Sequence, residues 1–61
     1  MTKFEQYQEL RGWDIARHDE NRRQLKAGEV DRVAFDILEQ ARAATYRAEF
    51  ERIMPALTIT R

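Results

Sequence analysis

Residues 25–35 read LKAGEVDRVAF, and this stretch decides the fold. Gly28 stands where a left-handed residue commonly ends a helix, and Lys26 in the preceding turn suits the negative end of the helix dipole. Asp31 is the preferred N-cap of a second helix, with Glu29 as the competing candidate. The stretch therefore predicts a tight turn between two helices.

Helix signals extend in both directions from this turn. Upstream, Thr2 and Glu5 have the spacing of a capping box, and the residues that follow are mostly helix formers. Downstream, Pro55 disfavours helical geometry at the residue before it. We therefore predict helices over about 3–27 and 31–54.

A short connection between two long helices makes an antiparallel hairpin, so the predicted fold class is all-α. The turn segment resembles the hairpin turn of several small bacterial helical modules. We expect one helical-hairpin domain over 1–61. Its last residues, 55–61, are expected to be extended or frayed, with fraying favoured over pairing as an edge strand.

Length and composition make self-association the expected source of stability. A chain of 61 residues forms one domain at most. Such a chain buries only about 60% of the surface that its unfolded form exposes. Small domains usually add disulfides, a metal or oligomerisation. Because the sequence has no cysteine and one histidine, oligomerisation is the remaining device, and we expect no metal or other cofactor.

The charge balance and the apolar pattern limit the partners. Eleven basic residues balance eleven acidic ones, which argues against strong nonspecific binding to nucleic acid. No apolar run approaches the ~18 residues of a membrane span, and the N-terminus lacks a signal-peptide core. We therefore expect a cytoplasmic protein that does not associate with membranes.

The second predicted helix carries two apolar faces when residues are placed at ~100° per step. The face nearer its end is aromatic and consists of Phe35, Tyr46, Phe50 and Ile53. The opposite face is smooth and rich in alanine, and its residues are Val30, Val33, Ala34, Ile37, Leu38, Ala41, Ala44 and Ala48. The first helix has one stripe, which is sufficient to cover only one of these faces, and it consists of Phe4, Tyr7, Ile15, His18 and Leu25. In an antiparallel hairpin, the start of this stripe comes beside Phe50 and Ile53.

The uncovered face predicts a homodimer. Each fully buried Val, Leu or Ile contributes roughly 1.5–3 kcal/mol, so leaving this row in water is costly. Ala34, Ala41 and Ala48 recur every seventh residue and allow a partner helix to approach closely. Two hairpins are expected to meet through the second helix as a four-helix bundle. The predicted interface is Val30, Val33, Ala34, Ile37, Ala41, Ala44 and Ala48.

His18 is the strongest candidate for a catalytic residue, but we expect it to have a packing role instead. As a general base it would need an orienting acid, which Asp14 one turn earlier can supply, together with a pocket and a nucleophile. A two-helix hairpin offers little concavity, and the chain has no serine or cysteine. We therefore expect no enzyme activity and no catalytic residues, with His18 paired to Asp14 in the hairpin seam.

Trp13 is the strongest candidate for binding a partner. Trp13 and Leu10 lie off the packing stripe of the first helix, with Arg17 one turn further along. Tryptophan and arginine dominate binding hot spots, so these three residues predict a partner-binding site. The expected function is a noncatalytic protein-interaction module, such as an adaptor, inhibitor or regulator, of the kind that phages and plasmids also encode.

The alternative prediction is a regulator that binds nucleic acid. Arg22, Arg23 and Lys26 form the densest basic cluster, and dimerisation would align two copies of it. In length and hairpin plan the chain is similar to the small four-helix-bundle dimers that control plasmid copy number by gripping paired RNA loops. Between residues 11 and 32, however, acidic residues are interleaved and reduce the net charge to one. We therefore rank this function second.

Overall fold

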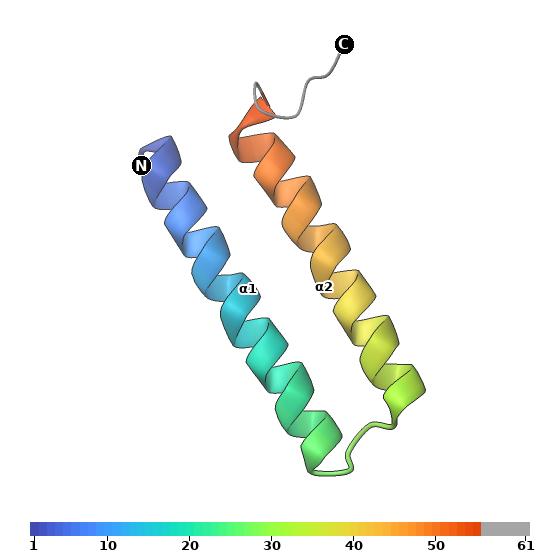
Figure 1. Cartoon of the computed structure of the whole chain (residues 1–61). Coiled ribbons are helices and arrows are strands. Elements are labelled where there is room, and N and C mark those ends of the chain that lie inside the picture. Colours follow the sequence, from blue (N-terminus) through green and yellow to red (C-terminus); the bar gives the residue numbers. More distant parts are fainter. Residues whose placement is uncertain (56–61) are drawn as a thin grey trace.

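The computed structural model describes residues 1–55 as an antiparallel hairpin of two helices, α1 (Lys3–Lys26) and α2 (Arg32–Ile53) (Figure 1). The start of α1 and the end of α2 lie at the same end of the hairpin. The predicted all-α hairpin is confirmed, with helix boundaries within one residue of those expected. The prediction of a frayed tail falls on residues 56–61, which lie outside the described part of the chain.

Local side-chain chemistry starts both helices. At α1 the Thr2 hydroxyl accepts from the Glu5 backbone N–H at 3.1 Å, and the Glu5 carboxylate accepts from the Thr2 backbone N–H at 2.9 Å. This confirms the capping box. At α2 the Asp31 carboxylate accepts from the Ala34 backbone N–H at 2.8 Å. Asp31 is therefore the N-cap.

Gly28 ends α1 as expected, because it adopts the left-handed conformation with φ 77°. Its N–H donates to the Leu25 carbonyl at 3.1 Å, and the Glu29 N–H donates to the Gln24 carbonyl at 2.9 Å. These two bonds are those of a Schellman motif, which satisfies the last carbonyls of the helix. A side chain at Gly28 would be strained whatever the surrounding space.

The hairpin is a single layer of two helices. The Cα atoms of the chain span 41 × 27 × 9 Å. Within residues 1–55, the buried hydrophobic side chains are Leu10, at 8% exposure, and Ile53, at 5%. Globular domains usually pack at least two layers around a shared core, and one layer leaves both broad faces in solvent.

The seam between the helices changes character along its length. Its residues recur every three or four positions along each helix and are buried, half-buried or in contact with the other helix. They are Tyr7, Leu10, Asp14, His18, Asn21 and Leu25 on α1 and Phe35, Glu39, Arg42, Tyr46, Phe50 and Ile53 on α2. The two ends of this list are apolar and aromatic. The middle is polar and charged, which the apolar stripes of the sequence did not predict.

The open end of the seam is aromatic. Tyr7 packs edge-on against Phe50, with ring centroids 5.9 Å apart, and Tyr46 stacks on Phe50 at 6.2 Å. The predicted packing of Tyr7 against Phe50 is confirmed. Phe4 and Ile15 were expected on the same stripe, but they are 64% and 51% exposed. The expected stripe was wrong at these positions because the seam begins at Tyr7 on α1 and passes through Asp14, one position before Ile15.

Neither helix in the described residues combines the length and the apolar character needed to cross a membrane.

Candidate interaction site

The middle of the seam holds a cross-linked polar cluster of five side chains. Arg42 donates to Asp14 across the seam and to Glu39 one turn away at 2.9 Å. Asn21 donates to the other Glu39 oxygen at 2.9 Å, and His18 Nδ1 lies 2.8 Å from Glu39 Oε1. Asn21 is 2% exposed, which makes it the most completely buried side chain of the described residues. The cluster therefore ties the two helices together at one register.

Hydrogen bonding keeps Glu39 and Arg42 ionised. Burial alone would raise the pKa of Glu39, but hydrogen bonds from Arg42, Asn21 and His18 outweigh burial and hold the pKa at about 2, against 4.5 for a free glutamate. The hydrogen bond that Arg42 donates to Glu39, and a further one that it donates to Asp14, raise the pKa of Arg42. No buried side-chain N or O atom among residues 1–55 lacks a partner. These groups are committed to one another, which suits a structural role.

The cluster corrects one expected pairing and adds one residue. His18 was expected to pair with Asp14, but Asp14 binds Arg42 and His18 binds Glu39. A pairing across the seam depends on the register of two helices, which a pattern within one helix does not contain. Sequence reasoning missed Asn21 altogether. The available signal was its position seven residues after Asp14, on the same side of α1.

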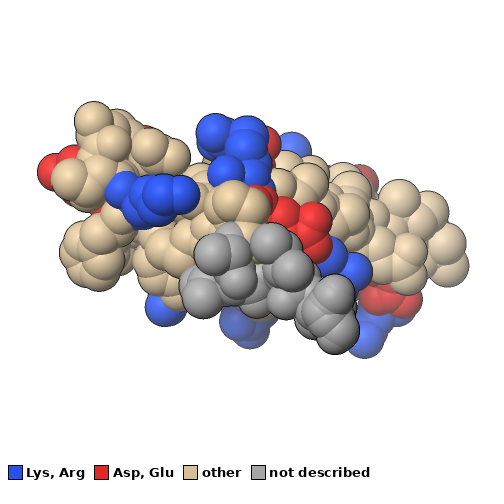
Figure 2. Space-filling view, turned by 90° about the horizontal axis from the view of Figure 1, so that it is seen from above, with Lys and Arg blue, Asp and Glu red and all other residues tan. Residues whose placement is uncertain are grey.

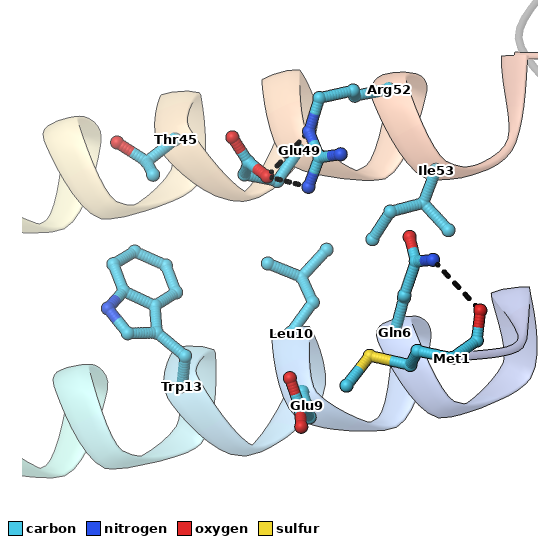
Figure 3. A pocket seen from close by; sticks show the side chains of 9 residues that line it. All are labelled: Met1, Gln6, Glu9, Leu10, Trp13, Thr45, Glu49, Arg52 and Ile53. Atoms are coloured by element: carbon cyan, nitrogen blue, oxygen red, sulfur yellow. Dashed lines mark hydrogen bonds and ion pairs between the residues drawn. The ribbon is translucent and has the colours of Figure 1, made fainter.

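Beside the apolar end of the seam lies an open groove of about 600 Å³ (Figure 3). Leu10 and Ile53 lie between the helices, and the indole of Trp13 extends from α1 towards Thr45. The groove is lined by Met1, Gln6, Glu9, Leu10, Trp13, Thr45, Glu49, Arg52 and Ile53. Its apolar base and polar rim are the general features of a site that holds an apolar side chain.

The three residues predicted to bind a partner lie at this groove or next to it. Trp13 is 39% exposed and Leu10 is 8% exposed. The expectation that Leu10 lies off the packing stripe was wrong, because the seam passes through Leu10 and places it at the base of the groove. Arg17 is exposed and lines a second hollow of about 190 Å³ together with Trp13. Trp13 and Arg17 therefore share one side of α1.

The face of α2 that points away from α1 is apolar and exposed. Val33 and Ile37 each stand two positions from Phe35, about 160° around the helix from the seam. They are 68% and 62% exposed. The outer stripe, as we call this surface, consists of the exposed residues Val33, Ile37, Ala41, Ala44 and Ala48. The other two residues of the predicted interface, Val30 and Ala34, are half-buried near the turn.

The three basic residues proposed for nucleic-acid contact differ in their surroundings. Arg23 is held between Glu20 at 2.7 Å and Glu29 at 3.3 Å. The hydrogen bond from Arg23, with another from Gln24, lowers the pKa of Glu20 to about 2. Arg22 and Lys26 are exposed and have no carboxylate partner among the described residues. Two of the three cations therefore remain uncompensated.

Seen from the end that carries the termini, acidic and basic side chains are mixed over the visible surface of the hairpin (Figure 2). Across residues 1–55 no three His, Asp or Glu side chains come together in a group that could hold a metal ion.

Comparisons with models of known protein families, with curated proteins and with solved structures found no match.

Proposed function

We propose that this chain is a noncatalytic helical module that binds other proteins and works as a homodimer. In the dimer, two hairpins pack through the outer stripe of α2 to form a four-helix bundle. The groove at Trp13 then remains available to a partner protein. Such a module acts as an adaptor, an inhibitor or a regulator.

One observation carries this proposal: the hairpin is a single layer that leaves large aliphatic side chains of α2 exposed. Val33 and Ile37 are more than 60% exposed on the outer stripe, whereas the buried apolar side chains of residues 1–55 are Leu10 and Ile53. Burying an aliphatic side chain of this size contributes roughly 1.5–3 kcal/mol. In a two-fold dimer each subunit would bury its own Val33 and Ile37 against the other, so the interface would contain two copies of this pair.

The alanines support the same arrangement. Ala41, Ala44 and Ala48 continue the outer stripe beyond Ile37 with short side chains. Helices approach more closely where their contact residues are small, and the packing of a second helix then excludes water along the row. Large residues near the turn and small residues towards the other end give the stripe a graded shape, which suits antiparallel packing of two α2 helices.

Sedimentation velocity over a range of protein concentrations tests the dimer. The wild-type chain should sediment as a dimer, and the double variant Val33→Asp, Ile37→Asp should sediment as a monomer. Ile15→Asp is the matched control, because Ile15 is 51% exposed but lies on α1, outside the outer stripe. A wild-type chain that remains monomeric at every concentration would refute the four-helix bundle.

Capture from native extract tests the partner site. Immobilised wild-type protein should retain a specific protein that the Trp13→Ala variant loses, while helicity and sedimentation stay unchanged. Phe4→Ala is the control, because Phe4 is an exposed aromatic on the same helix that does not line the groove. Equal capture by wild type and by Trp13→Ala would remove Trp13 from the proposed site.

A second candidate function is nucleic-acid binding, favoured by the uncompensated charges of Arg22 and Lys26. A dimer would present two copies of this pair. Titration against mixed RNA and duplex DNA at low salt tests it, because contacts to phosphates weaken steeply as salt rises. If neither binds at micromolar protein, this function is excluded.

A further inference from the structure

The side of α1 that faces away from the groove is basic, although the whole chain is neutral. Apart from the seam residues Leu10 and Ile53, the lining residues contributed by the two helices each stand one position before a seam residue: Trp13 precedes Asp14, and Thr45 precedes Tyr46. Because the helices are antiparallel, the same rotation from the seam points to the same side on both. Residues that directly follow a seam residue therefore lie on the opposite side of the layer.

Four residues of α1 form a row on that opposite side, which we call the basic row: Arg11, Ile15, Arg22 and Lys26. Each directly follows a seam residue, and their spacings of four, seven and four keep them on one face of the helix. All four are exposed, with Ile15 at 51%. Asp19 also lies on this face, so three cations accompany one carboxylate.

The charges of the basic row have no carboxylate partner among residues 1–55. Arg22 and Lys26 form no ion pair, and Arg11 interacts with the phenol of Tyr7. By contrast, Arg52 on the groove side pairs with Glu49 at 2.6 Å. The positive charge of the basic row is therefore left for a ligand of opposite sign.

We propose that the basic row is a docking surface for an acidic amphipathic helix of a partner protein. The proposal rests on the protein-binding role proposed above and names the chemistry of one partner. Along this face Ile15 follows Arg11 by one turn, and the cations Arg22 and Lys26 stand beyond Asp19. A helix with an apolar stripe bordered by Asp or Glu complements this order, as in other helix-to-helix recognition.

The same order argues against a nucleic-acid backbone as the ligand. Phosphate recognition gains from many closely spaced cations, whereas a half-exposed isoleucine at the centre of the row contributes nothing to it. An acidic polypeptide uses both the apolar and the charged positions, and it does not require a strongly basic protein.

Fluorescence anisotropy with two labelled peptides tests the proposal. Each peptide has about 20 residues, long enough to form a helix, with a leucine stripe flanked by glutamates in one and by lysines in the other. The Leu/Glu peptide should bind wild type, and binding should weaken as salt rises. The Leu/Lys peptide should bind at least about tenfold more weakly, because like charges meet. A labelled RNA duplex is the third probe.

Variants separate this surface from the dimer interface. Arg11→Glu with Arg22→Glu should weaken binding of the Leu/Glu peptide at least about tenfold and leave sedimentation unchanged. The milder pair Arg11→Gln with Arg22→Gln should weaken it less. The dimer-breaking variant Val33→Asp, Ile37→Asp should still bind the peptide, so failure of the dimer and failure of the docking surface give different results.

Three results would overturn the proposal. The first is no binding of the Leu/Glu peptide by wild type. The second is equal binding of the two peptides, or binding that survives reversal of Arg11 and Arg22. The third is tighter binding of the RNA duplex than of the Leu/Glu peptide, which would assign the basic row to nucleic acid.

Discussion

The middle of the seam and the outer stripe of α2 reverse the usual distribution of polar and apolar residues. Asn21, at 2% exposure, and the ionised pair Glu39 and Arg42 lie between the helices, whereas Val33 and Ile37 face solvent at more than 60% exposure. Buried ion pairs are costly to desolvate, and their attraction often does no more than offset that cost. The polar middle of the seam therefore fixes the register of the two helices. Additional stability from apolar burial requires that the exposed faces of the hairpin be covered.

Breaking the polar centre should have the largest effect. Arg42→Met leaves Asp14 and Glu39 without the cation that they share. Removing one partner of a buried pair typically costs about 3–5 kcal/mol, and partial solvent access reduces this to about 2–4 kcal/mol here. Chemical denaturation followed by circular dichroism at fixed protein concentration measures the loss. Arg47→Met, an exposed arginine of the same helix, should change stability by less than about 0.5 kcal/mol.

If both arginine variants lose the same free energy of unfolding, the cluster is not a special element of the seam. The exposed apolar residues of the outer stripe would then be the remaining unusual feature of the hairpin.

Acid should weaken the polar centre over a defined pH range. The pKa of Glu39 is about 2 in the folded chain and 4.5 when free. A lowered pKa contributes stability that is present above the free value and is lost as the pH falls towards the folded one. The loss is at most ~1.4 kcal/mol for each pH unit between the two pKa values, or about 3 kcal/mol in all. Denaturation midpoints measured from about pH 6 down to about pH 2 test this loss.

Glu39→Gln is the control for the acid prediction, because it should start less stable and lose less stability on acidification. High salt should be present throughout. It screens the exposed pair of Glu20 and Arg23, whose carboxylate also has a lowered pKa but contributes through solvent-exposed atoms. An unchanged acid slope in Glu39→Gln would show that other carboxylates determine the acid response.

The sequence predicted the local features of the hairpin and missed the polar middle of the seam for one physical reason. Caps at Thr2 and Asp31 and the left-handed Gly28 depend on a few neighbouring residues, so their patterns are complete within the sequence. The seam depends on the register of two helices. The expected stripe followed apolar residues to Ile15, whereas the actual row passes through Asp14 and its partner Arg42, which a search for apolar periodicity does not select.

The stability of the wild-type chain should depend on protein concentration if the outer stripe is a dimer interface. If apolar burial is completed by a second copy, each tenfold rise in protein concentration should stabilise the dimer by about 1.4 kcal/mol. Thermal denaturation at several concentrations measures this, and the midpoint should rise with concentration for wild type. The variant Val33→Asp, Ile37→Asp should show no such dependence. A concentration-independent wild type would mean that the hairpin is stable without a second copy.

The smallest effect on stability, and the most informative on specificity, is expected for Asn21→Leu. The variant loses one hydrogen bond to a carboxylate, about 1.5–3 kcal/mol, and gains burial of a leucine side chain of roughly the same value. The net change should therefore be below about 1 kcal/mol. A buried asparagine in a helical interface commonly fixes register and oligomeric state, because only one alignment satisfies its amide. Asn21→Leu should therefore keep the helicity and stability of wild type but populate more than one species in sedimentation velocity. A single dimeric species in the variant would show that Arg42, Asp14 and Glu39 fix the register without Asn21.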